Sequence, residues 1–387
     1  MRLGPVRRVA AAAQSPDGIE RWVVTGYAEA VAALSDPRLS TQRAYEAGAG
    51  SQVNCADAGT QATDGNRMRQ TMLTAGPPDH TRLRKIVVRA FSATRIEALR
   101  PRVQQIAGEL LDALAARDED PVDLVETFAL PLPVRVICEI LGVPRDQCDR
   151  LLKSAGLPGP HRGIVVPVDA ISATLAELIA ARRRQPADDL LSTLTAAHEQ
   201  GRLSDTELIN TAVLLFAAAH HNTAILITRG VLTLLQHPQQ LAEVRSGATH
   251  VSSAVDELLR HHPPAVAVPR HALEDVEIGG VAIPGGSYVQ IVLAAGNRDP
   301  AVFTAPDSFD IHRAGGEGLA FGHGIHSCLG TRLAKLEGEV AIGTLLRRFP
   351  GLAIAATPDG GSEPPKPVSH GDGWLLPVHL NKAPAIA

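Results

Sequence analysis

The chain has 387 residues, of which 45% are hydrophobic and 20% charged, and its formal net charge is −4 at pH 7. This composition excludes a wholly disordered chain, and the 37 lysines and arginines are scattered rather than gathered into tracts, which argues against nucleic-acid binding. The N-terminal apolar run, Val9 to Ala13, is too short for a signal sequence or a membrane span, so we expect a cytoplasmic protein without a membrane segment.

The predicted elements start with a short strand and then become helical. A strand at 22–24 and a turn at Thr25-Gly26 precede an alanine-rich helix that ends before Asp36-Pro37. Residues 41–75 lack periodicity and predict a long loop, which we interpret as a lid or pocket wall. Helical periodicity then predicts helices at 79–91, 94–117, 122–142, 145–154, 167–184 and 187–199.

The second half contains the longest predicted helix, then a small sheet, then a final helix. Ser204 and Asp205, followed by Glu207, give a capping signal for an apolar helix that runs to about residue 236. Short alternating runs at 276–278, 281–283 and 287–292 predict strands. No linker divides the chain. We therefore predict one domain over residues 1–387, helix-rich at 79–262 and near the C-terminus, with small sheets at 20–25, 265–295 and 365–380.

The four cysteines are Cys55, Cys138, Cys148 and Cys328. They include no CxxC pair, and in a chain of this length they fit neither a disulfide framework nor a zinc site. Each cysteine must therefore be judged alone.

Cys328 lies in a glycine-rich segment just before a predicted helix at 331–337. Gly322, Gly324 and Gly330 let the backbone approach a flat ligand closely. The N-terminus of the following helix favours thiolate over thiol, which suits a cysteine that binds iron. An isolated cysteine beside a glycine-rich turn is more often a buried structural residue, so the whole pattern has to decide.

The segment Phe321-Gly322-His323-Gly324-Ile325-His326-Ser327-Cys328-Leu329-Gly330 resembles the haem-binding signature of the cytochrome P450 family, Phe-Gly-x-Gly-x-His-x-Cys-x-Gly, at every fixed position. The resemblance implies a cytochrome P450 fold of the soluble bacterial type, mainly α with small β-sheets. It also implies that haem b is bound by this segment, with Cys328 as thiolate ligand to iron and His326 at a propionate. Such a ligand donates electron density and favours O–O bond cleavage.

Two further motifs match the family. Glu257-Leu-Leu-Arg260 would by itself be a modest surface ion pair on a helix, but it matches the family's Glu-x-x-Arg motif and so is given a structural role. His80 and Arg84, in a turn that leads into a helix, match the positions that hold the haem propionates, and Arg270 corresponds to a third contact. The alternative for the first of these segments is a proline-initiated helix with exposed basic residues.

The resemblance covers almost the whole chain and includes 294–300 and 309–313. It is weakest at 41–72 and 155–172, where members of the family differ because their substrates differ.

The long helix departs from the family pattern of Ala-Gly-x-acid-Thr, in which an acid and an alcohol relay protons during oxygen activation. The spacing to His237-Pro238 and to Glu257 puts Ala219 at the glycine, His221 at the acid and Asn222 at the alcohol. A shift by one residue would make Thr223 the alcohol but spoil both spacings.

Four explanations of this departure stay open. Ordered water can deliver protons, His221 can donate them, a substrate hydroxyl or amide can complete the relay, or the enzyme can accept peroxide directly. We favour the substrate-assisted relay.

The pocket walls are expected from small or aliphatic segments: the loop at 60–75, the helix face at Ala217, Ala218 and His221, the turn at 264–268 with Val266 and Val268, and residues 373–375. Trp374 could stack on an aromatic ligand, although a single aromatic residue near a C-terminal strand is more often part of the core.

The resemblance implies a haem-thiolate monooxygenase that uses O2, with ferredoxin and ferredoxin reductase as electron donors, to oxidise a small natural-product intermediate in secondary metabolism. Arg332 and Lys335 lie where an acidic ferredoxin would dock, or else form a solvated face. One alternative is aromatic coupling or ring closure on a peptide-like or polycyclic substrate. Another is a non-catalytic, haem-bearing module that recruits other enzymes, against which the intact motifs argue.

Overall fold

The computed structural model describes residues 4–9, 21–46, 71–154, 168–314, 318–355 and 375–380. The backbone divides into two compact units. Unit 1 comprises residues 1–84, 259–309 and 313–329, and unit 2 comprises 85–258, 310–312 and 330–387. Several predictions lie outside the described residues: the loop at 60–70, the sheet region at 365–374, Trp374 and Cys55. That the chain forms one domain stays a prediction.

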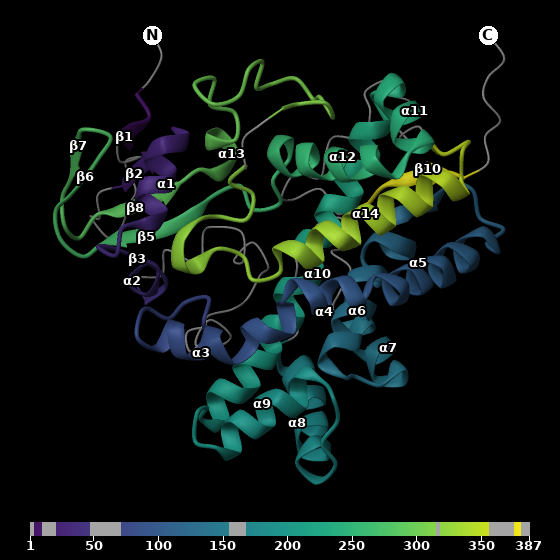
Figure 1. The fold of residues 1–387 in the computed structure, drawn as a ribbon, viewed down its shortest axis with the longest axis horizontal. Coiled ribbons are helices and arrows are strands. Elements are labelled where there is room, and N and C mark those ends of the chain that lie inside the picture. The colour runs from purple at the N-terminus through teal and green to yellow at the C-terminus, as the bar shows by residue number, and fades with distance from the viewer. Residues whose placement is uncertain are drawn as a thin grey trace. The chain divides into compact units, whose positions relative to one another are not determined.

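Unit 1 is built around a five-stranded sheet in the order β1-β2-β8-β5-β3 (Figure 1). The strand bounds are Val6–Val9, Arg21–Val24, Tyr288–Ile291, Val268–Ala272 and Leu39–Ser40 in that order. β2 runs parallel to β8, and the other neighbours are antiparallel. Helix α1, Tyr27–Ser35, packs its buried alanine and leucine side chains into the core of this sheet, because apolar residues recur on one face of the helix.

The shorter elements of unit 1 confirm most of the sequence predictions. β6 (Val276–Ile278) and β7 (Val281–Ile283) have the predicted bounds, and they pair as an antiparallel hairpin. The remaining helices are α2 (Thr41–Glu46), α13 (Leu293–Gly296), the 3-10 turn η4 (Gly324–His326) and the start of α3 (Asp79–Val87). The prediction of an uninterrupted loop at 41–75 was wrong at its start, because α2 buries Thr41 and Ala44 there.

Unit 2 is helical. Its helices are η2 (Val88–Phe91), α4 (Ala93–Ala98), α5 (Arg100–Ala115), α6 (Pro131–Leu141), α7 (Arg145–Ser154), α8 (Val168–Arg184), α9 (Leu190–Glu199), α10 (Asp205–Leu235), α11 (Pro238–Ser246), most of α12 (Ala248–His261) and α14 (Thr331–Arg348). A small sheet has the order β4-β10-β9, with bounds Val122–Asp123, Pro377–His379 and Ala353–Ile354.

Two long helices predicted for unit 2 are each divided into shorter elements in the structure. The prediction at 94–117 is divided at Leu99, where α5 starts with Pro101 in its first turn. The prediction at 122–142 becomes β4, a π-helical turn at Val125–Ala129, and then α6. The reason lies partly in a distant segment: Asp123 accepts the backbone N–H of Val125 at 3.0 Å and also that of Leu376 at 2.8 Å, which ties this segment to a strand far along the chain.

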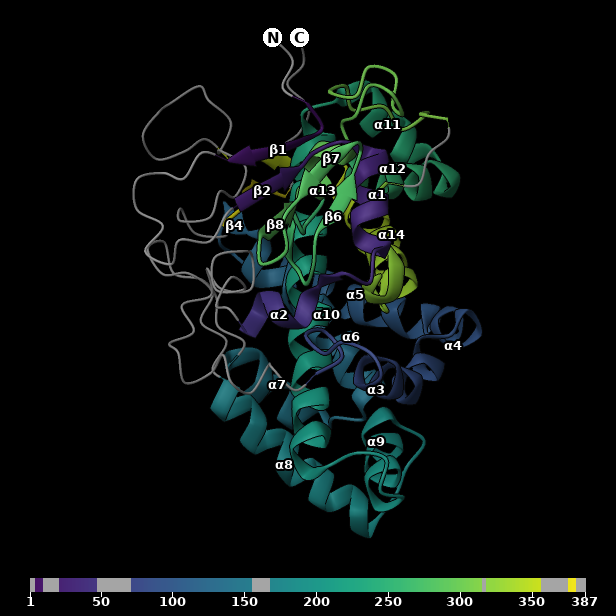
Figure 2. The same ribbon diagram turned by 90° about the vertical axis from the view of Figure 1, so that its left-hand side faces the viewer.

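Helix α10 is the predicted long helix, with 31 residues and the predicted capping box between Ser204 and Glu207. It is long and apolar enough to cross a membrane, yet most of it is buried inside the structure, as in the core helix of a soluble protein. Figure 2 shows α8 and α9 beside it. α14 crosses α10 so closely that a Cβ on Gly230 would lie 2.8 Å from Cδ1 of Ile342.

Candidate active site

The Cys328 loop has a shape that depends on glycine. Gly322 and Gly324 have left-handed φ angles of 67° and 73°, which disfavour other residues. A Cβ on Gly324 would lie 2.6 Å from the carbonyl oxygen of Leu34 in α1, so this position also has no room for a side chain. The backbone N–H of Cys328 donates to the carbonyl of Phe321 at 2.8 Å, which closes the loop. Cys328 itself is exposed, three residues before α14 begins.

Four basic side chains of unit 1 gather near this loop, and we call them the cationic cluster: His80 and Arg84 of α3, Arg270 of β5, and His326 of η4. The rings of His80 and His326 lie 4.5 Å apart between centroids. Arg270 is only 4% exposed, and its guanidinium donates to the carbonyl of Pro269 at 2.8 Å. Among the described residues, no carboxylate pairs with Arg84 or Arg270.

The members of the cationic cluster oppose one another's protonation. Burial lowers the pKa of Arg270 to about 10. Burial, and then the positive charges of Arg270, His80 and Arg84, lower the pKa of His326 to about 3. Burial, and then the positive charge of Arg84, lower the pKa of His80. The backbone of Ile325 opposes this shift, although it makes no hydrogen bond to either ring nitrogen.

A buried set of donors and cations without a carboxylate is costly unless an anion completes it. Neither ring nitrogen of His80 has a hydrogen-bond partner among the described residues. The cluster therefore fits the two carboxylates of a haem, with the exposed thiol of Cys328 two residues from His326.

Beyond its exposed first residues, α10 reaches a surface of unit 2 again at its middle. Ala218 and Asn222 are exposed, one helical turn apart, and Ala217, Ala219 and His221 are half-buried. This stripe offers small or neutral side chains and neither an acid nor an alcohol. His220 is turned the other way: it is 1% exposed, its Nδ1 lies 2.8 Å from the carbonyl of Phe216, and burial lowers its pKa.

Thr223 faces the helix packing rather than the exposed stripe. It is 4% exposed, and its hydroxyl donates to the carbonyl of Ala219 at 3.0 Å. Glu337 of α14 is buried on the same side, at 1% exposed. Burial raises the pKa of Glu337 to about 8, and the nearby Thr223 hydroxyl opposes that rise. Among the described residues, neither carboxyl oxygen of Glu337 has a hydrogen-bond partner, and with a pKa of about 8 the group is mostly protonated at pH 7.

Sequence reasoning missed Glu337, although a signal for it was available. On a helix it shares a face with the apolar residues Leu333, Val340 and Ala341 at spacings of three and four. A carboxylate among these apolar residues is expected to be buried with them on the packed face of the helix.

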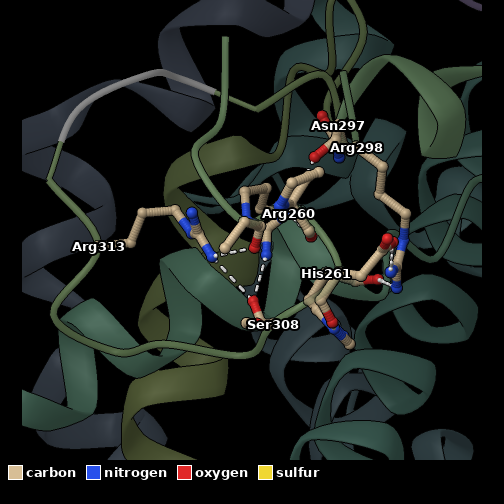
Figure 3. Close-up of polar contacts among 9 residues, drawn as sticks. Arg260, His261, Asn297, Arg298, Ser308 and Arg313 are labelled. Atoms are coloured by element: carbon tan, nitrogen blue, oxygen red, sulfur yellow. Dashed lines mark hydrogen bonds and ion pairs between the residues drawn. The ribbon is translucent and has the colours of Figure 1, made fainter. Parts of the chain in front are cut away.

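Glu257 and Arg260 of α12 are both buried, at 4% and 3% exposed, and each holds a loop of its own unit. In unit 2, Glu257 Oε1 accepts the backbone N–H of Asp310 at 2.9 Å. In unit 1, Arg260 donates to the carbonyls of Asn297, Pro306 and Ser308 at 2.8–3.0 Å, and Figure 3 shows Arg313 reaching the same carbonyl of Ser308. The structural role of the pair within the fold stays a prediction.

Comparison with known proteins agrees with this geometry. A sequence model of the family "Cytochrome P450" matches residues 146–359. The chain belongs to the cytochrome P450 family. It is 43% identical over 372 residues to cytochrome P450 107B1 of Saccharopolyspora erythraea, covering 93% of this chain and 88% of the relative. It is also 43% identical to 6-deoxyerythronolide B hydroxylase of the same organism, covering 88% and 86% of the two chains.

The structure of the tirandamycin C-bound P450 monooxygenase TamI superimposes with a TM-score of 0.79 at 40% identity, covering 94% of this chain and 90% of that one. The predicted family, the mainly α fold and the assignment as a P450 oxidoreductase are thereby confirmed. Membership of the family implies a thiolate-ligated haem.

The structure places the remaining predicted residues separately. In unit 1, Val266 is 39% exposed and Val268 is half-buried at the start of β5. In unit 2, Gly330 precedes the first residue of α14. Phe321 and Gly322 lie in the closed Cys328 loop. The roles of these residues, and those of the α10 residues, stay predictions.

Proposed function

We propose that this P450 is a cytoplasmic monooxygenase of one domain that oxidises a small, mainly aliphatic natural-product intermediate. Relatives named 6-deoxyerythronolide B hydroxylase and mycinamicin VIII C21 methyl hydroxylase support the reaction and a natural-product substrate. The observation that carries the proposal is the cationic cluster, which no carboxylate of the described residues neutralises, next to the glycine-shaped Cys328 loop. Cys328 would hold the iron of haem b, and His80, Arg84, Arg270 and His326 would hold its carboxylates. The bound haem would supply the reductive activation of O2.

We further propose that a hydroxyl or amide of the substrate completes the proton relay. The exposed stripe of α10 carries Asn222 where the family has an alcohol, and an amide side chain has no acidic proton to give. Thr223 does not replace it in this geometry, because its hydroxyl proton is already donated to the Ala219 carbonyl. His221 is half-buried on the same stripe, where its imidazole can orient water.

The substrate class is tested by recording the Soret spectrum of the purified holoenzyme during titration with macrolides, aromatic polyketides, terpenes and cyclic dipeptides. A shift from low spin to high spin is expected with the aliphatic compounds. A resting spectrum of nitrogen-ligated form that no compound moves would contradict catalysis and favour the recruitment module.

The relay is tested with Asn222→Thr. Substrate assistance predicts no gain in product formed per electron consumed, because the substrate already supplies the group. If Asn222→Thr raises coupled turnover without changing the product, the helix simply lacks its alcohol and substrate assistance is abandoned. Thr223→Val tests the alternative alignment, in which Thr223 rather than Asn222 is the relay alcohol. A large loss of coupling in this variant would support that alignment.

The mass of the product separates hydroxylation from the alternative of aromatic coupling or ring closure. Hydroxylation adds one oxygen atom, whereas coupling removes two hydrogen atoms. The stripe without acid and alcohol allows both, so the product is the discriminating observation.

Ferredoxin, reduced by its reductase, is the proposed electron donor. Arg332 at the start of α14 is exposed. Lys335, one turn later, pairs with Asp256 at 2.7 Å, so part of its charge is already compensated. Arg332 is therefore the stronger candidate for contact with an acidic partner.

A further inference from the structure

Two buried cysteines that lie outside the proposed active site come together in unit 2. Cys138 is on α6 and Cys148 is on α7, ten residues later in the sequence, and they are 2% and 4% exposed. The two helices pack side by side (Figure 1). They are joined by a short connection in which Gly142 has a left-handed φ of 78° and ends α6.

Helix geometry brings both sulfur atoms to the same turn of α6. The Sγ of Cys148 lies 4.0 Å from the carbonyl oxygen of Val134. In an α-helix that carbonyl accepts the backbone N–H of the residue four positions later, which is Cys138. Side chains on a helix lean toward its N-terminus, so the Cys138 side chain extends back toward Val134. The two thiols meet there and share a side-chain hydrogen bond.

The neighbourhood distinguishes the two thiols. The hydrogen bond from Cys138 lowers the pKa of Cys148 most strongly, burial and Asp149 oppose this, and Arg135 assists it. The hydrogen bond with Cys148, burial, and the carboxylates of Glu139 and Asp149 all raise the pKa of Cys138. Cys148 also lies on α7, the less buried of the two helices, so we expect it to react first, as the thiolate that is the nucleophile in thiol chemistry.

We propose that Cys138 and Cys148 form a reversible disulfide when the protein meets a small peroxide. The Cys148 thiolate attacks one oxygen of the peroxide, the O–O bond breaks, and a sulfenic acid forms with release of hydroxide. The sulfur of Cys138 then attacks the Cys148 sulfur and displaces its oxygen, which leaves as water with a proton from the Cys138 thiol. In total the two thiols lose two hydrogens, and hydrogen peroxide becomes two molecules of water.

The bond would fasten α7 to the more deeply buried α6. Of the α7 side chains, only Cys148 and Leu151 are buried among those described, so a local opening of this ten-residue helix is enough to admit a molecule as small as hydrogen peroxide. In a reducing compartment thiols would restore the pair, which makes the bond transient rather than structural.

The test treats the haem-loaded full chain with hydrogen peroxide and, separately, with diamide, which oxidises thiols without using haem. Free thiols are then alkylated in denaturant and the peptides are mapped without reduction. The expected result is one linked peptide containing Cys138 and Cys148, two mass units lighter than the reduced pair, which dithiothreitol reverses. The oxidised protein should also unfold a few degrees higher, because the cross-link restricts the unfolded chain.

Two variants check the order of the steps. Cys138→Ser should stop the reaction at a sulfenic acid on Cys148, trapped by dimedone, and Cys148→Ser should leave Cys138 reduced. Recovery of both wild-type thiols fully alkylated after both oxidants overturns the proposal, and so does a disulfide that instead contains Cys55 or Cys328. The wild-type result decides the question even if a variant fails to fold.

Discussion

The cationic cluster of unit 1 and the middle of α10 in unit 2 both bury ionisable groups, but they differ in what becomes of the charge. Arg270 keeps its charge at 4% exposure, with a pKa still near 10, and no carboxylate of the described residues pairs with it. On α10 and α14 the buried groups become neutral instead: burial lowers the pKa of His220 and raises that of Glu337 to about 8. Charge is retained where an anionic ligand would balance it, and is lost where helices pack only on each other.

Replacing Arg270 should give the largest effect. Arg270→Leu leaves the haem carboxylates without their most buried partner, and losing one partner of a buried charge pair costs about 2–5 kcal/mol. We expect at least tenfold faster haem transfer to apomyoglobin. Arg43→Leu is the control, since Arg43 is exposed and pairs with Glu46. Equal rates for both variants would contradict the assignment of the cluster to haem.

The Cys328 loop should be the next most sensitive feature. Gly324→Ala places a Cβ 2.6 Å from a backbone oxygen and in a left-handed conformation. Gly280→Ala has a similar φ of 76° but open space around it, so it should show only the backbone cost of about 1–2 kcal/mol. In urea unfolding, Gly324→Ala should lose at least twice as much. Equal losses would show that the close approach to Leu34 does not constrain the loop.

Glu337 should make stability depend on pH. Its folded pKa of about 8 lies above the ordinary 4.5, so the folded chain binds the proton more tightly than the unfolded chain. The contribution is fully present below pH 4.5 and is lost as pH rises to 8, by about 1.4 kcal/mol for each pH unit. Glu337→Gln, neutral at every pH, should remove this slope between pH 6 and 8 in urea unfolding.

Glu339→Gln is the control for that experiment. Glu339 lies on the same helix but pairs with Arg100 at 3.2 Å and accepts from Ser252 at 2.9 Å. It should keep the slope of the wild type. If Glu337→Gln keeps it too, Glu337 is ionised in the folded protein and the contrast with Arg270 fails.

The smallest expected effect is at the exposed charges of α14. Exposed ion pairs are worth about 0–1 kcal/mol, so Arg332→Glu should slow reduction by ferredoxin only several-fold. Lys335→Glu should slow it less, because Asp256 already offsets that charge. Stopped-flow reduction at rising ionic strength should bring the variants together, and rates independent of salt would exclude electrostatic docking.

Local patterns in the sequence were sufficient for much of this protein. The Cys328 segment is continuous in the sequence, so the family, the glycines and the predicted cysteine ligand to haem could be recognised without a structure. The capping box of α10 and the strands β6 and β7 depend on residues within a few positions of each other, and both features were predicted correctly. Prediction erred at 41–46 and 122–142, where distant strands and side chains reshape the backbone.

Only the tertiary structure decided the state of the buried groups. Glu337 is neutral because α10 and α14 cross there, although more than a hundred residues separate Thr223 from Glu337 in the chain. Cys138 and Cys148 showed no motif in the sequence, since a spacing of ten residues becomes a contact only when two helices pack. Desolvation and partner choice depend on which side chains meet, and that depends on the whole fold rather than on neighbours in the sequence.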